Sequence, residues 1–162
     1  MFIIKEYWCF QYQSQVQCCQ KNKSKIMKMD SNMKTVNVVA AIIEKGHKIF
    51  ATQRGYGEFK DGWEFPGGKI EAGEAKEAAL VREIHEELAT TIKVKEHFCT
   101  VDYDYPNFHL HMDCYLCSVV DGNLSLLEHE AAKWLGRDDL ETVAWLEADL
   151  SIIEKLKEYL AK

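Results

Sequence analysis

The stretch Gly68–Thr90, GKIEAGEAKEAALVREIHEELAT, decides how this chain folds and what chemistry it offers. From position 74 to 88 it contains no Gly or Pro and is rich in Ala, Leu, Glu and Lys, which predicts a helix. On that helix Glu83, Glu86 and Glu87 fall within an arc of about 100°. Apolar residues on the other side predict a core face: Ala78, Leu80, Val81, Ile84 and Leu88.

Carboxylates three and four residues apart on a helix repel one another. Each exposed pair costs about 0.2–0.5 kcal/mol, so helix stability alone does not favour the pattern. One interpretation is an ordinary solvated acidic face, and the other is a site for a divalent cation such as Mg²⁺, which prefers oxygen ligands. The preceding Pro66-Gly67-Gly68-Lys69 predicts a tight turn where backbone can approach a ligand closely, and it favours the cation site.

The sequence around this helix has the pattern of a mixed α and β domain. Short apolar runs bounded by turn residues predict strands at 36–43, 48–52, 63–65, 92–94, 98–105 and 110–120. Segment 53–62 is polar and predicts a loop, and apolar residues at helical spacing predict a helix within 144–160, broken just before Asp149. One mid-chain helix and one C-terminal helix around a strand-rich centre predict the α+β class.

Written as a pattern, the first stretch is Gly68-x5-Glu74-x7-Arg82-Glu83-Ile84-x-Glu86-Glu87-x-Ala89. It resembles the signature of the Nudix family, Gly-x5-Glu-x7-Arg-Glu-U-x-Glu-Glu-x-Gly-U with U a bulky aliphatic residue, at seven of the nine specified positions. The departures are Ala89 in place of Gly and Thr90 in place of the last aliphatic residue. A left-handed helix end would suit Gly, and Ala costs about 1 kcal/mol more there.

The resemblance covers roughly residues 35–160. The segments VNVVAAIIEKGHKIFATQR (36–54) and WEFPGGKIEAGE (63–74) are similar to the MutT branch of the family, and especially to its CTP pyrophosphohydrolase-like members. The resemblance implies a Nudix domain over residues 35–162, folded as an α/β/α sandwich with a mixed β-sheet between helices.

The resemblance also implies an activity. MutT-type enzymes use Mg²⁺, or Mn²⁺, to hydrolyse a nucleoside triphosphate to the monophosphate and pyrophosphate, which cleanses the pool of modified or surplus nucleotides. The matched positions imply metal ligands in Glu83, Glu86, Glu87 and the Gly67 carbonyl. They also imply residues that shape the motif, namely Gly68, Glu74 and Arg82.

The general base is left open between Glu83 and Glu128. Glu83 lies in the implied metal-binding set, and a carboxylate beside a metal can orient water. Glu128 matches a loop acid that MutT-type enzymes place at the metal site, where it would be both a ligand and a catalytic residue. The alternatives are that Glu128 is an ordinary loop acid or that Glu130 takes its place.

Four further residues are candidates for substrate binding. Arg54 and Lys69 match cations that would contact phosphates, the alternative being surface cations. Asp149 matches a position that faces the base, and it is equally a preferred helix N-cap. An ionised Asp149 only accepts hydrogen bonds, which favours cytosine, guanine or 8-oxoguanine because these bases present donors. Phe65 either stacks on the base or belongs to the core.

Charge is divided unevenly along the 162 residues. The whole chain has 20 basic and 26 acidic residues, a net charge of −6, but residues 1–34 carry six Lys and two acids. Residues 35–162 are therefore at −10, which argues against binding nucleic acid through a positive surface and against RNA decapping. Segment 1–34 is predicted to be an appended or disordered extension, with an interaction arm as the alternative.

No apolar run is long enough to span a membrane, and basic residues follow the apolar ones in the extension instead of preceding them as in a secretory signal. We therefore expect a cytoplasmic monomer or homodimer with a small nucleotide substrate, and neither a membrane nor a stable nucleic-acid partner. A Nudix hydrolase acting on another nucleoside diphosphate derivative and a non-catalytic nucleotide-binding module remain alternatives.

The cysteines predict neither a disulfide framework nor a zinc site. Cys114 and Cys117 are three residues apart on a predicted strand, so they face opposite sides of the sheet and are expected to be buried thiols. His109 and His111 share a face of the same strand, which is typical of a surface or lining pair.

Overall fold

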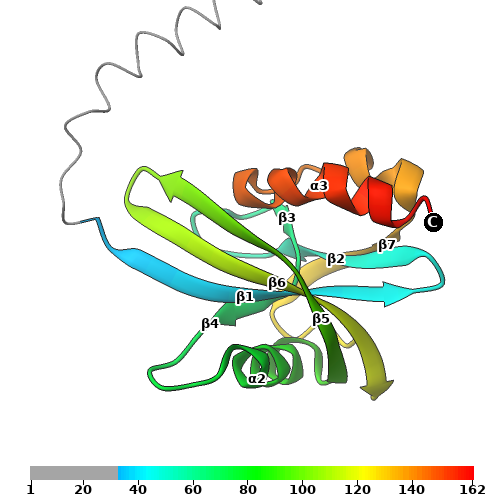
Figure 1. Ribbon diagram of the computed structural model, residues 1–162, viewed down its shortest axis with the longest axis horizontal. Coiled ribbons are helices and arrows are strands. Elements are labelled where there is room, and N and C mark those ends of the chain that lie inside the picture. The colour runs from blue at the N-terminus through cyan, green and yellow to red at the C-terminus, as the bar shows by residue number, and fades with distance from the viewer. Residues whose placement is uncertain (1–32) are drawn as a thin grey trace, which may run out of the picture. The chain divides into compact units, whose positions relative to one another are not determined.

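The computed structural model describes residues 33–162, so the predicted extension at 1–34 lies outside the described residues except for Met33 and Lys34. The elements in chain order are β1 (Thr35–Lys45), β2 (Lys48–Arg54), β3 (Trp63–Glu64), β4 (Gly67–Lys69), α2 (Lys76–Leu88), β5 (Thr91–Tyr105), β6 (Phe108–Asp121), β7 (His129–Leu135), the 3₁₀ helix η2 (Arg137–Thr142) and α3 (Glu147–Tyr159). Figure 1 shows three layers, with α3 above the strands and α2 below them.

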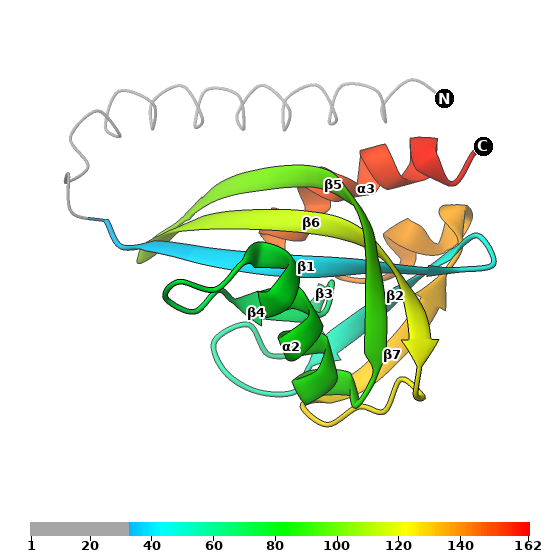
Figure 2. The same ribbon diagram turned by 60° about the horizontal axis from the view of Figure 1, so that its bottom comes forward.

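The sheet is mixed, as predicted. β1 pairs in parallel with β6, from Thr35 opposite His109 to Ile43 opposite Cys117, whereas β5 pairs antiparallel with β6 and β4 antiparallel with β1. The end of β1 pairs with β2, and β2 carries β3 and β7. Figure 2 shows β2 and β7 crossing below β1 at an angle, so the sheet bends around α2.

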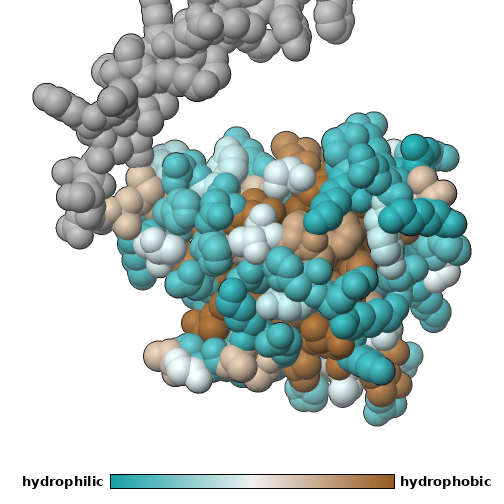
Figure 3. Space-filling model, viewed as in Figure 1, coloured by the Kyte–Doolittle hydropathy of each residue, from teal (hydrophilic) through white to brown (hydrophobic). Residues whose placement is uncertain are grey.

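Two hydrophobic clusters hold the layers together. One lies on the α3 side of the sheet and includes Ile152 and Leu156, while the other lies on the α2 side and includes Leu80 and Ile84. The face drawn in Figure 3 is largely hydrophilic, with hydrophobic surface visible in patches. Apolar residues packed from both faces confirm the predicted α/β/α sandwich of the α+β class.

Helix α2 forms as predicted, except that Ala78 is exposed and its neighbour Ala79 is buried in the core face instead. The helix begins at Lys76, two residues later than expected, because Ala75 has extended backbone and Glu74 remains in the preceding loop. Ala89 ends the helix in the left-handed conformation, with φ of 49°, which confirms the strained end expected from the missing Gly. The hydroxyl of the buried Thr90 lies 2.9 Å from the Leu88 carbonyl and 2.8 Å from that of Asn123.

Three strand predictions were wrong. Residues Gly67–Lys69 form strand β4 instead of a simple turn, because their backbone pairs with β1 at Val38–Ala40. Strand β5 is continuous through 95–97, where two strands were expected, since bulges accommodate the polar residues against β6. β7 was not predicted, because its residues, His129–Leu135, become a strand only by pairing with β2.

The C-terminal helix α3 begins at Glu147, with extended backbone at Leu146 as its N-cap. Asp149 is therefore inside the first turn, where its N–H donates to the Leu146 carbonyl at 3.0 Å. This rules out the interpretation of Asp149 as the N-cap residue and leaves its buried side chain for another role.

The described cysteines are reduced and lie on both sides of the sheet. Cys114 packs in the cluster under α3 and Cys117 in the cluster over α2, which confirms that the pair cannot share a zinc ion. His109 and His111 are surface residues that contact Asp102 at 3.2 and 2.7 Å. Within 33–162, no helix is both long and apolar enough to cross a membrane.

Candidate active site

Arg82 connects the carboxylates of α2 to the loop that precedes the helix. Its guanidinium donates to both oxygens of Glu74, at 2.9 and 2.8 Å. Its Nη1 lies 2.8 Å from Glu83 Oε1 and 3.3 Å from Glu86 Oε2, and its Nη2 donates to the Lys69 carbonyl at 3.1 Å. One cation thus offsets the repulsion that Glu83 and Glu86 would otherwise impose on the helix.

Glu87 turns away from Arg82 and toward the sheet. Its Oε2 accepts a hydrogen bond from the Gly67 N–H at 3.1 Å. Burial, together with the charges of Glu64 and Glu83, raises the pKa of Glu87 to about 7, although His129 and the Gly67 N–H act in the opposite direction. The three acids of the predicted arc therefore have different surroundings, since the Glu86 side chain is 55% exposed.

The two glycines of β4 permit two close approaches, that of β1 to Gly67 and that of α2 to Gly68. A Cβ on Gly67 would lie 2.1 Å from the Val39 carbonyl oxygen, and its φ of +152° also requires Gly. A Cβ on Gly68 would lie 2.3 Å from Glu83 Oε2. Gly67 is thus needed by the backbone, whereas Gly68 is needed by the position of one carboxylate.

A small cavity of about 60 Å³ lies beside the end of this acidic face. Glu128, Glu87, Arg54 and three residues not predicted from sequence line it, the three being Tyr56, Glu64 and His129. The Tyr56 hydroxyl donates to Glu128 Oε2 at 2.9 Å. Glu128 and Glu87 both line the cavity. Glu130 does not line the cavity and instead packs against Gly55.

Glu64 and His129 are the buried partners that sequence reasoning missed. Arg54 Nε donates to Glu64 Oε1 at 3.0 Å, and His129 Nε2 lies 3.5 Å from the same oxygen. His129 Nδ1 is buried and has no hydrogen-bond partner among the described residues. The sequence did contain a signal for Glu64, because it is an acid between two aromatic residues, Trp63 and Phe65, in a predicted short strand.

A larger cavity of about 230 Å³ adjoins the small one, and Arg54 and Glu64 line both. The structure brings Lys69, Phe65 and Asp149 together in its lining, along with Gly67 and Gly68. Phe65 is 4% exposed and stacks on Trp145 with ring centroids 4.7 Å apart, so it is both a core residue and a cavity wall.

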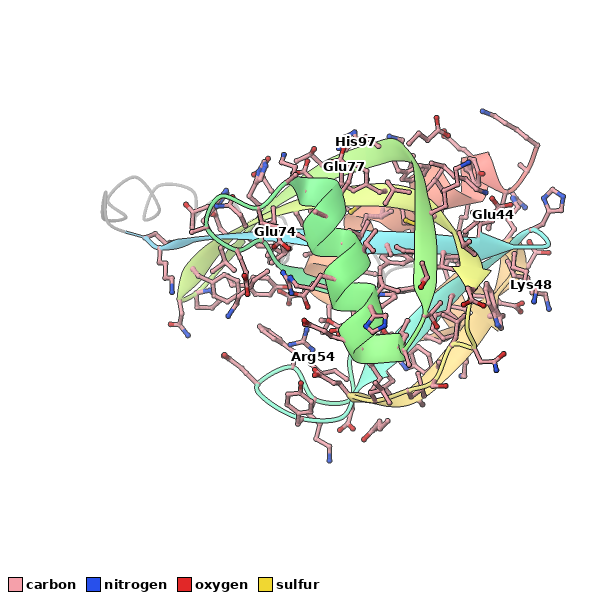
Figure 4. All side chains as sticks on the ribbon, turned by 90° about the horizontal axis from the view of Figure 1, so that it is seen from below. Glu44, Lys48, Arg54, Glu74, Glu77 and His97 are labelled. Atoms are coloured by element: carbon pink, nitrogen blue, oxygen red, sulfur yellow. The ribbon has the colours of Figure 1, made fainter. Side chains whose placement is uncertain are left out.

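Viewed from below in Figure 4, Arg54 and Glu74 lie along one side of α2, opposite Glu44 and Lys48 of the β1–β2 hairpin.

Asp149 is the most deeply buried acid of the cavity. Its Oδ1 accepts a hydrogen bond from the Phe65 N–H at 3.3 Å. Burial, with a contribution from the charge of Glu64, raises the pKa of Asp149 to about 8, although Arg54 and the Phe65 N–H lower it. The Asp149 carboxyl therefore takes up its proton at a higher pH than an exposed aspartate does.

The residues of α2 and β4 suit a hard divalent cation by the chemistry of their donors. Glu83, Glu86 and Glu87 offer carboxylate oxygens on one side of a helix, and the backbone of Gly67 lies against them. Within 33–162, no three His, Cys, Asp or Glu side chains already surround one point. The reason is that Arg82 holds Glu83 and Glu86 while the Gly67 N–H holds Glu87.

The fold is an α/β/α sandwich, in which the acidic face of α2 packs against the glycines of β4 beside a cavity. These features are those of a Nudix hydrolase. Comparison of the sequence agrees, because the NUDIX domain matches residues 33–156. The chain therefore belongs to the Nudix family, and it is a Nudix hydrolase.

Three similar proteins illustrate the relationship. The CTP pyrophosphohydrolase of Escherichia coli is 34% identical over 123 residues, covering 75% of this chain and 91% of that protein. The 8-oxo-dGTP diphosphatase of Escherichia coli is 32% identical over 127 residues, covering 77% and 98%. The crystal structure of a MutT NUDIX hydrolase from Burkholderia pseudomallei superposes with a TM-score of 0.66 at 28% identity, covering 75% of this chain and 97% of that chain.

Proposed function

We propose that this chain is a Mg²⁺-dependent nucleoside triphosphate pyrophosphohydrolase of the MutT type, in which Mn²⁺ can replace Mg²⁺. It converts an NTP or dNTP and water to the monophosphate and pyrophosphate, and it serves nucleotide-pool sanitation. The observation that carries the proposal is the Arg54–Glu64 pair, which is common to the walls of both cavities. A nucleotide can thus place its base beside Asp149 and its phosphates toward α2.

Four carboxylates, Glu83, Glu86, Glu87 and Glu128, with the Gly67 carbonyl, would hold the cation. When bound, Mg²⁺ neutralises phosphate charge and lowers the pKa of an attacking water, which a domain at −10 requires in order to accept a polyphosphate. Arg82 and Glu74 position the helix and loop. Glu83 and Glu128 both remain candidates for the residue that accepts the proton from water.

Base selection is assigned to the larger cavity. Asp149 lies at its buried end, and Phe65 offers an aromatic wall there. Cytosine and 8-oxoguanine are the favoured bases, because both present N–H donors to a carboxylate. The names of the two Escherichia coli relatives, which act on CTP and 8-oxo-dGTP, support the same pair. Arg54 and Lys69, at the cavity rim, are assigned to the phosphates.

The activity is assigned to the cytoplasm and to a monomer or homodimer that acts on free nucleotides. The net negative charge of residues 35–162 supports free nucleotides as substrates, because such a surface does not attract nucleic acid.

The test is a comparison of kcat/KM for CTP, 5-methyl-dCTP, 8-oxo-dGTP and dATP with Mg²⁺, following pyrophosphate release. We expect a cytosine or 8-oxoguanine nucleotide to exceed dATP by about tenfold or more, because a pocket that hydrogen-bonds the edge of one base disfavours a base whose donors and acceptors are placed differently. Inert triphosphates alongside cleavage of a nucleotide sugar or dinucleoside polyphosphate would move the chain to another Nudix substrate class. Binding that persists without metal and without turnover would identify a non-catalytic module.

A further inference from the structure

Two cysteines that are distant in sequence face each other across the β5–β6 ladder. Cys99 on β5 is directly opposite Cys114 on β6, between the pairs Thr100–Asp113 and His97–Tyr115. Directly opposed residues of antiparallel strands have Cα atoms about 4.5–5.5 Å apart. A disulfide requires about 4.4–6.8 Å, so strand pairing brings the two backbones within the range of a disulfide.

The two thiols differ in access. Cys114 is fully buried in the cluster under α3, whereas Cys99 is half-buried at the edge of the same cluster. An oxidant from solvent therefore reaches Cys99 first, and Cys114 lies directly behind it. Cys117 provides a contrast, because it is buried in the other cluster with no cysteine opposite it.

The surroundings also favour a reactive Cys99. A hydrogen bond from the Cys114 thiol, and the nearby Lys155 ammonium, lower the pKa of Cys99 despite its partial burial. The same hydrogen bond and burial raise the pKa of Cys114. Lys155 is held at this position because it donates to the Phe98 carbonyl and lies over the Phe98 ring at 4.7 Å. The thiolate is the reactive form of cysteine, so Cys99 is the nucleophile of the pair.

We propose that Cys99 and Cys114 form a redox-active dithiol, which a hydroperoxide converts to an intramolecular disulfide. The Cys99 thiolate attacks a peroxide oxygen, the O–O bond breaks, and hydroxide leaves to give a sulfenic acid. The Cys114 sulfur then attacks the Cys99 sulfur, the S–O bond breaks, and the oxygen leaves as water with the Cys114 proton. Two thiols and one hydrogen peroxide thus give one disulfide and two waters, and a dithiol reductant reverses the change.

The disulfide would form behind the wall of the larger cavity. Cys114 is also opposite Ala40 of β1, and Ala40 lines that cavity. We expect the cross-link to raise the midpoint of thermal unfolding by several degrees, because it restricts the unfolded chain.

The experiment treats the reduced full-length protein with hydrogen peroxide, labels the remaining thiols and maps them by mass spectrometry after chymotrypsin. This protease cleaves after Tyr103, Phe108 and Tyr115, and so separates Cys99, Cys114 and Cys117 into different peptides. We expect a linked Cys99–Cys114 peptide pair that disappears on reduction, while Cys117 remains labelled as a free thiol. Cys117→Ser is the matched control and should form the link as the unmodified chain does.

Cys114→Ser should leave a sulfenic acid at Cys99 that a dimedone probe captures, and Cys99→Ser should leave Cys114 reduced. Circular dichroism checks that each variant is folded, and Cys114→Ala is the alternative if the serine is not tolerated. The proposal is overturned if both cysteines stay reduced in the unmodified chain. It is also overturned if Cys99 links to Cys9, Cys18, Cys19 or a second chain instead of Cys114.

Discussion

Two acids of α2, Glu83 and Glu86, have surroundings opposite to those of Asp149 in the first turn of α3. Glu83 and Glu86 share the guanidinium of Arg82, and their side chains are 16% and 55% exposed. Asp149 is buried, receives one backbone hydrogen bond and has its pKa raised to about 8. Acids of the first kind suit a hydrated cation and phosphates, whereas an acid of the second kind suits the edge of a base.

The difference shows that the surroundings of an acidic residue decide its exposure, its hydrogen bonds and its pKa. The proposed function uses both groups, which are about 65 positions apart in the chain. Three experiments test whether the two groups act as different kinds of acid, and a fourth tests the end of α2.

The largest effect is expected at Glu86. Glu86→Gln should lower kcat with Mg²⁺ by about 10³-fold, because it removes an anionic oxygen from the proposed cation site. The side chain is 55% exposed, so the fold should be unaffected. Glu77→Gln, an exposed acid on the same helix outside the arc, is the matched control and should keep its kcat within about twofold. Equal losses in the two variants would remove the distinction between the acids of α2.

Gly68→Ala should lower kcat by about 10²-fold while leaving the chain folded. The new Cβ meets only the carboxylate end of Glu83, which must shift, and a shift of about 1 Å has effects of this size. Gly67→Ala should instead lower the free energy of unfolding by several kcal/mol, because its Cβ meets the Val39 backbone. Urea unfolding and steady-state kinetics of both variants measure the contrast. Full activity in Gly68→Ala would mean that Glu83 is not a ligand at this position.

Asp149 should make nucleotide binding depend on pH. A base that donates to Asp149 binds the ionised form, so CMP affinity should rise about tenfold per pH unit up to about 8 and then level off. The charged groups that face Asp149 are Glu64 and Arg54, and Tyr105 lies nearby. Calorimetry from pH 6 to 9 measures the effect, with Asp149→Asn as the reference that corrects for titration of the phosphate. Parallel pH profiles in both proteins, or weaker binding as pH rises, would contradict it.

The smallest effect is expected where α2 ends. Ala89→Gly should raise the free energy of unfolding by about 1 kcal/mol, because Ala89 has φ of 49° and Gly adopts this conformation without strain. The same substitution at Ala78, which is exposed in the first turn of α2, should lower it by up to about 1 kcal/mol. Neither should change kcat by more than about twofold. A loss of activity in Ala89→Gly would show that the helix end takes part in the site.

Local patterns explain which features could be predicted. The acidic arc and the core face of α2 follow from the spacing of residues on one helix, and the left-handed Ala89 follows from the position at which the family signature has Gly. The strands β4 and β7 could not be predicted in this way, because three residues such as Gly67–Lys69 are extended only by pairing with β1. The sequence did not predict the surroundings of Asp149, since the helix begins earlier, at Glu147, and burial raises the pKa of the side chain.

The sequence by itself determined the family, the α+β sandwich and the carboxylate face of α2, because these depend on residue types at fixed short spacings. Only the tertiary structure decided that Arg82 binds two of those carboxylates, that Glu64 and His129 complete the small cavity, and that Cys99 faces Cys114. Such pairings depend on strand register and on packing between distant segments. Spacing along the chain carries no information about them, whereas burial and hydrogen bonding in the folded domain define them.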